Sequence, residues 1–171
     1  IRKNGLVKRL ESSFYAFCKS LKAFRQANEN MIDMWENDKI FIAPDLDINA
    51  LIEAGCSEEE IEQKMNEKAE TNPKNASFKR EHFDEDYIEQ LRHDQALLDD
   101  MWLEWEYIDD DDYSKFAKVE DLLKHELFKK DRNPEGKIVV FSESVDTVEY
   151  LQRRINRQDE IEIGRAVQQE C

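Results

Sequence analysis

The chain has 171 residues, enough for one domain with a sizeable core but too few for two domains of full size. Its 25 Lys and Arg residues against 40 Asp and Glu residues give a net charge of −15, which argues against broad nucleic-acid binding by the chain as a whole. Three widely spaced cysteines indicate neither a disulfide framework nor a zinc knuckle, and no apolar run approaches the roughly 18 residues of a membrane span. We therefore expect a soluble, cytoplasmic protein.

Charge is unevenly distributed along the chain. Residues 1–25 hold seven basic residues and one acidic residue, whereas the rest of the chain is strongly acidic. A basic arm on an acidic body favours either an internal electrostatic contact or a nucleic-acid-binding edge of a larger protein. In the second case, the basic residues that we predict to contact nucleic acid are Lys8, Arg9, Lys19 and Lys22.

The first predicted element is one long amphipathic helix over residues 7–35. Its apolar residues follow spacings of three and four throughout, with Asn28 as the only polar member of the stripe. Two shorter helices are predicted at residues 48–54 and 57–69. The second of them begins with an S-x-x-E capping box formed by Ser57 and Glu60.

The middle of the chain is predicted to be a loop followed by a second long helix. Residues 70–79 are polar and contain an Asn-Pro pair, which is typical of a loop. From about residue 80 the three-four rhythm returns and continues to Trp105. We expect this helix to pair antiparallel with the first one through a shared aromatic seam. The acidic run at residues 109–112 then suits a break between helices.

The hydrophobic period changes near the end of the chain. A helix over residues 116–127 is followed by an Asn-Pro-Glu-Gly turn and by the short apolar run Lys-Ile-Val-Val-Phe at residues 137–141. Such a run predicts a strand buried on both faces of a parallel sheet, and a helix follows at residues 145–155. Only residues 160–163 offer a weak second strand, so we expect the rest of the sheet to lie outside the chain.

The predicted fold class is therefore mainly α. It consists of long antiparallel helices in a bundle, with a small α/β piece, one buried strand plus a helix, near the C-terminus. Glycines are too sparse for a loop that wraps backbone amides around nucleotide phosphates. Asp45, Asp47 and Asn49 have the spacing of EF-hand ligands, but Ala50 replaces the required glycine. We predict no catalytic residue, no metal site and no cofactor in this chain.

Two stretches resemble the bacterial Swi/Snf-type branch of the superfamily 2 helicases and translocases. The stronger runs from Ser114 to Ile155 and contains KIVVFSESVDTVEYLQRRI, similar to the start of the second RecA-like lobe, where a strand and the loop after it form motif IV. The weaker runs from Gly5 to Phe17, similar to the helical segment that follows the first lobe. The resemblance implies three parts: a helical insertion and linker (1–130), the start of the second lobe (131–156) and a tail (157–171).

The resemblance also implies a function. Ser142 and Ser144 would lie in the motif IV loop, where hydroxyls can donate to phosphate, although Glu143 would oppose that contact. The parent protein would be an ATP-dependent DNA helicase or translocase that uses ATP and Mg²⁺. This non-catalytic segment would brace the motor lobes or contact DNA, with the remainder of the motor as partner, no membrane contact, and self-association through the exposed motor face. The alternative is a free-standing helical domain that binds a helix of another protein.

Overall fold

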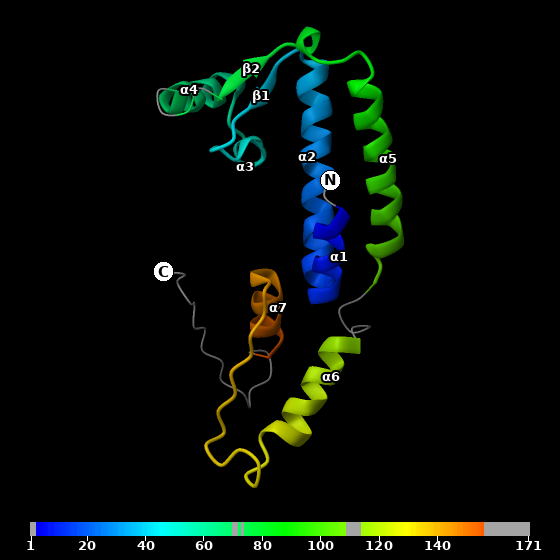
Figure 1. Ribbon diagram of the computed structural model, residues 1–171, viewed down its shortest axis with the longest axis vertical. Coiled ribbons are helices and arrows are strands. Elements are labelled where there is room, and N and C mark those ends of the chain that lie inside the picture. The colour runs from blue at the N-terminus through cyan, green and yellow to red at the C-terminus, as the bar shows by residue number, and fades with distance from the viewer. Residues whose placement is uncertain (1–2, 70–71, 73, 109–113, 156–171) are drawn as a thin grey trace. The chain divides into compact units, whose positions relative to one another are not determined.

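The computed structural model describes residues 3–69, 72, 74–108 and 114–155 (Figure 1). The chain divides into two compact units, one formed by residues 1–20 and 105–171 and the other by residues 21–104. The first unit thus joins residues from both sides of the boundary expected at 130/131. Most described residues are helical, which confirms the mainly α class. None of the described helices is long and apolar enough to span a bilayer.

The N-terminal stretch forms two helices, α1 (Lys3–Ser12) and α2 (Phe14–Glu36), where a single helix was predicted. The break falls at Ser13, whose Oγ accepts a hydrogen bond from the backbone N–H of Ala16 at 3.1 Å. A serine that binds nearby backbone in this way favours a helix start over a helix interior. The apolar stripe nevertheless continues across the break, because Phe14, Phe17 and Leu21 are all buried.

Helix α2 lies antiparallel to α5 (Tyr87–Trp105), as predicted, and Figure 1 shows the two side by side. In the second unit, Arg25 near the start of α2 pairs with Asp99 near the end of α5, at 2.6 Å between Nη2 and Oδ1. Towards the other ends, the rings of Trp35 and Tyr87 lie 5.6 Å apart. In the first unit, the rings of Phe14 and Phe17 both contact that of Trp105, at 5.3 and 5.4 Å. The predicted aromatic seam is therefore confirmed.

A small antiparallel sheet in the second unit was not predicted. Strand β1 (Ile40–Ile42) pairs with β2 (Ala76–Phe78), with Ile40 opposite Phe78. The second strand lies in the stretch that we assigned to a loop. The sheet completes a core whose buried members come from α2, β1, α3 (Ile48–Glu53) and α4 (Glu58–Ala69): Met34, Ile40, Phe41, Ile48, Ile61 and Met65.

The predicted capping box of α4 is confirmed. The Ser57 N–H donates to Glu60 Oε2 at 2.8 Å, and the Glu60 N–H donates to Ser57 Oγ at 3.3 Å. After β2 a short 3-10 turn, η1 (Arg80–His82), leads into α5, so the second long helix begins at Tyr87 rather than near residue 80. The two helices predicted at residues 48–54 and 57–69 are present as α3 and α4.

The first unit contains α6 (Ser114–Leu122), the π-helical turn η3 (Leu123–Leu127) and α7 (Val145–Ile155). Its core consists of Phe116, Leu123, Tyr150 and Ile155. The prediction of a buried strand at residues 137–141 was wrong: the segment forms no strand, and Val139 and Phe141 are 74% and 85% exposed. Among the described residues no strand pairs with it, so no neighbouring strand supplies hydrogen-bond partners for its backbone N–H and C=O groups. The acidic run at 109–112, residues 160–163 and the tail at 157–171 lie outside the described residues.

Candidate functional site

The polar residues that lead into α7 cap the helix. Ser144 is buried, and its Oγ accepts a hydrogen bond from the backbone N–H of Thr147 at 3.4 Å. One step earlier, Ser142 Oγ accepts from the backbone N–H of Ser144 at 3.2 Å. Serine is among the residues that favour the N-cap position, because its oxygen satisfies one of the free N–H groups of the first turn. Both serines of the expected motif IV loop are thus engaged by local backbone.

A cluster of three hydroxyls joins the break between α1 and α2 to the first turn of α7. Thr147 Oγ1 lies 2.8 Å from Ser12 Oγ and also 2.8 Å from Ser13 Oγ. Ser13 and Thr147 are buried, so these hydrogen bonds satisfy groups that water does not reach. We call Ser12, Ser13 and Thr147 the hydroxyl cluster. It fixes where the start of α7 lies against the N-terminal helices.

Beside the hydroxyl cluster, two cations converge on one carboxylate. Asp146 Oδ2 lies 2.9 Å from Arg9 Nη1, and Asp146 Oδ1 lies 2.7 Å from Lys19 Nζ. Arg9 Nη1 also donates to Ser144 Oγ at 3.2 Å. Asp146 stands in the first turn of α7, where the helix dipole favours negative charge. We call Arg9, Lys19, Ser144 and Asp146 the clasp.

The charges of the clasp stabilise one another. The hydrogen bond from Lys19 to Asp146 raises the pKa of the lysine above its ordinary value of 10.5. A second acid, Glu149, lies further away, at 3.8 Å between Oε2 and Lys19 Nζ. Lys19 is therefore fully charged at neutral pH and directed at α7. The basic arm makes the internal electrostatic contact that its sequence suggested as one of two alternatives.

An aromatic cluster fixes the orientation of α7 about its own axis, so that Asp146 in the first turn faces Arg9 and Lys19. Tyr150 stacks on Tyr15 with 5.3 Å between ring centroids and meets Phe116 edge-on at 5.5 Å. From the last turn, the guanidinium groups of Arg153 and Arg154 lie over the rings of Tyr15 and Phe116, at 4.6 and 5.0 Å. Such cation–π contacts add to the burial of the rings. Helix α7 is thus anchored along its length to α1, α2 and α6.

The segment before the clasp is apolar and exposed. Asn133 fixes its beginning, because its side-chain amide donates to the carbonyl of Lys137 at 3.0 Å and accepts from the N–H of the same residue at 3.3 Å. Ile138 packs against the core of the first unit. Val139, Val140 and Phe141 then extend into solvent. We call residues 138–141 the apolar segment.

Three of the six residues predicted to contact nucleic acid come together in the clasp: Arg9, Lys19 and Ser144. Ser142 precedes the clasp, Lys8 is exposed on α1, and Lys22 is exposed in the second unit. Sequence reasoning missed Asp146 and the hydroxyl cluster. The signal was present, since Ser-Val-Asp-Thr combines a favoured N-cap residue with an acid in the first turn. Contact of these residues with nucleic acid stays a prediction.

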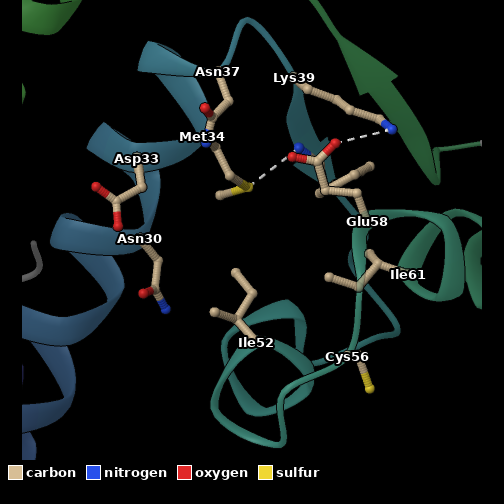
Figure 2. A pocket seen from close by; sticks show the side chains of 10 residues that line it. Asn30, Asp33, Met34, Asn37, Lys39, Ile52, Cys56, Glu58 and Ile61 are labelled. Atoms are coloured by element: carbon tan, nitrogen blue, oxygen red, sulfur yellow. Dashed lines mark hydrogen bonds and ion pairs between the residues drawn. The ribbon is translucent and has the colours of Figure 1, made fainter.

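In the second unit, a pocket lies between α2, β1, α3 and α4 (Figure 2). Lys39 Nζ lies 3.2 Å from Glu58 Oε2 and 3.3 Å from Glu62 Oε1. Burial lowers the pKa of Lys39, but the hydrogen bonds to both glutamates outweigh it and leave the pKa above its ordinary value. Asn30 and Asp33 extend from α2 on the other side (Figure 2). Within the described ranges, no group of three or more His, Cys, Asp and Glu side chains is arranged to hold a metal ion. The ion pairs tie β1 to α4, which is a structural role.

Comparison with known proteins adds no relative. A scan against protein-family models, a search of curated proteins and a search of solved structures each find no match to this chain.

Proposed function

We propose that this chain is a non-catalytic part of an ATP-dependent DNA helicase or translocase of the bacterial Swi/Snf type, in which it connects the two RecA-like lobes. The observation that carries the proposal is the apolar segment, which has the composition of a buried parallel strand and yet is unpaired among the described residues and exposed from Val139 to Phe141. Exposed apolar surface of this kind marks a contact site. A parallel sheet would cover both faces of the segment and satisfy its backbone groups.

The connection between the apolar segment and α7 supports the same proposal. Only residues 142–144 separate Phe141 from the start of α7. Loops of two to six residues are usual between a strand and the helix that follows it in α/β units. The clasp then lies at the carboxyl end of that strand, the edge at which α/β sheets bind ligands. This is the position that the resemblance assigns to motif IV.

In the proposed protein, the linker acts as a brace. The hydroxyl cluster and the clasp attach α7, the first helix of the second lobe, to α1 and α2. The second unit would be an insertion carried by the same α2 helix. ATP and Mg²⁺ would bind to the remainder of the motor, and a cytoplasmic location accompanies a DNA motor of this type.

The test compares amide hydrogen exchange in this chain alone and in the full-length parent protein. We expect the amides of residues 138–141 to exchange rapidly in this chain and to be strongly protected in the full-length protein, because a parallel ladder would form there. The amides of Val148–Ile155 are the internal control and should be protected in both. Equal, rapid exchange of residues 138–141 in both proteins would refute the proposal, as would a full-length sequence without a G-x-x-x-x-G-K-[ST] loop.

A substitution separates the role of the segment from folding of this chain. Val140→Lys should leave the stability of this chain unchanged, because Val140 is exposed here. In the full-length protein it would place a charge on a buried face of the sheet, so we expect loss of DNA-stimulated ATP hydrolysis. The matched control is Leu103→Lys, which alters a similarly exposed apolar residue on α5. Wild-type hydrolysis by the Val140→Lys protein would contradict a buried strand.

A further inference from the structure

Apart from Asp146, the residues of the clasp are types that bind phosphate. A guanidinium and an ammonium group approach one anion at 2.9 and 2.7 Å, and the guanidinium also contacts the hydroxyl of Ser144 at 3.2 Å. Arg, Lys and Ser side chains are among the groups with which proteins contact the phosphates of nucleic acids. The anion that these groups hold in this chain is the carboxylate of Asp146.

We propose that Arg9 and Lys19 form a surface that binds the nucleic-acid backbone, and that Asp146 masks this surface by competing with phosphate for the same two cations. The inference rests on the proposed function, because the motor supplies the nucleic acid. It goes further by assigning a residue that controls access. Arg9 and Lys19 cannot form close ion pairs with Asp146 and with a phosphodiester group at the same time. Release of the carboxylate therefore precedes or accompanies binding.

The exposure of the three side chains allows such an exchange. Arg9 and Lys19 are 43% and 52% exposed, whereas Asp146 is only 19% exposed. The carboxylate is thus fixed on α7, while the two cations sit on flexible stems at the surface and can turn outward. Ion pairs at partly exposed sites contribute little to stability, so a polyanion can displace them. Helix α1 also presents Lys8, which is exposed next to Arg9.

The net charge of the chain explains why pairing of Asp146 with Arg9 and Lys19 should change the affinity for nucleic acid. With a net charge of −15, the chain repels nucleic acid except where basic groups gather. In the clasp, the charge of Asp146 offsets one of the two cations, and Glu149 lies within 3.8 Å of Lys19. Removing the charge of Asp146 leaves two cations without their main partner. A guanidinium pairs with two oxygens of a phosphate as well as with those of a carboxylate, so a phosphate can take the place of Asp146 beside Arg9.

The test measures binding of labelled duplex and single-stranded DNA to this chain by fluorescence anisotropy at several salt concentrations. Asp146→Asn keeps the shape of the side chain and removes its charge. Each cation that moves to a phosphate adds about 0.9 to the slope of log affinity against log salt for duplex DNA. Two cations therefore steepen the slope by about 1.8 and raise the affinity about tenfold or more in 0.1 M salt.

The matched control is Asp121→Asn, which removes the same charge in the same unit. Asp121 pairs with Lys118 at 3.2 Å and takes no part in the clasp. A gain that is equal for both variants would show an effect of net charge alone and would overturn the mask. The gain must also disappear when Arg9→Gln and Lys19→Gln are added to Asp146→Asn, and a triple variant that keeps it would overturn the assignment of the two cations.

A second measurement does not depend on the folding of the Asp146 variant. Lys19→Gln changes an exposed side chain, and it should weaken the residual DNA binding of the wild-type chain several-fold at low salt. Unchanged affinity would remove Lys19 from the surface. Polyglutamate serves as the comparison polyanion: a gain for Asp146→Asn as large as the gain with DNA would overturn the assignment to nucleic acid.

The two proposals fail separately. If Asp146→Asn binds DNA no better than Asp121→Asn while residues 138–141 become protected in the full-length protein, the mask is wrong and the motor assignment stands. If Asp146→Asn gains affinity while residues 138–141 stay unprotected, the motor assignment is wrong. The nucleic-acid surface would then belong to a protein of another class.

Discussion

Replacing Thr147 with valine tests whether the hydroxyl cluster attaches α7 to the N-terminal helices. The substitution keeps the shape of the side chain and removes the oxygen that lies 2.8 Å from both Ser12 Oγ and Ser13 Oγ. Each hydrogen bond contributes about 0.5–1.5 kcal/mol net, so the loss of two should cost about 1–3 kcal/mol. Ser13 Oγ would still accept from the Ala16 N–H, but it would lose its hydrogen-bond partner on α7.

The effect should be measured by hydrogen exchange of the amides at Val148–Ile155 in α7. A cost of about 1–3 kcal/mol lowers protection by roughly five- to 150-fold if these amides exchange through opening of the first unit. Thr147→Ser is the control, because it keeps both hydrogen bonds and loses one methyl group, worth about 0.8 kcal/mol. Protection within about twofold of wild type for Thr147→Val, or an equal loss for Thr147→Ser, would refute this account of the cluster.

Three further predictions concern the core, a helix cap and pH. Leu21→Ala should lower the free energy of unfolding by about 2–5 kcal/mol, since Leu21 is fully buried, and an unchanged midpoint in urea would contradict its place in the core. Ser57→Ala should cost about 1 kcal/mol by removing the cap of α4, whereas Ser57→Asp should restore most of it; thermal unfolding of the second unit measures both. Because the folded chain raises the pKa of Lys19, its contact with Asp146 stabilises fully below pH 10.5 and is lost as pH rises through the raised value. Urea midpoints measured across that range should fall more steeply for wild type than for Asp146→Asn, and parallel curves would show that the pair does not contribute.

Features that depend on neighbours in the sequence could be predicted. The capping box of α4 needs only Ser57 and Glu60, three residues apart, and it forms as expected. The antiparallel pairing of α2 with α5 follows from two long stripes of apolar residues that have to cover each other. Both inferences use local spacing, which the tertiary structure has no reason to override.

Features that depend on distant partners could not be predicted. The periodicity of the apolar residues continues through Ser13 and outweighs the weak signal of a serine that can cap the Ala16 N–H, whereas the second partner of its hydroxyl, Thr147, is 134 residues away. The strands β1 and β2 have three residues each, and α3 and α4 lie between them in the sequence. Strands this short carry too few residues for an alternating pattern to be recognised.

The candidate site was predicted in part. The basic arm identified Arg9 and Lys19, and the resemblance to motif IV identified Ser144, but no property of the sequence linked these residues to one another. Asp146 is one acid among 40 Asp and Glu residues, so its charge alone could not single it out. For the apolar segment, the sequence pattern was clear but the described structure does not follow it. Its pattern predicts a strand, and the pairing that a strand requires is not found in the described part of the chain.

Asn28, the polar residue in the apolar stripe of α2, has a consequence for the alignment of the two long helices. Asn28 Nδ2 donates to the carbonyl of Leu91 at 2.8 Å and to Gln95 Oε1 at 2.9 Å. An apolar seam offers nearly equivalent packing after a shift of one or two turns, but the amide finds both acceptors at only one offset. Asn28 therefore sets the register of α2 against α5. An apolar side chain there would strengthen the pair and remove the reason for its single alignment.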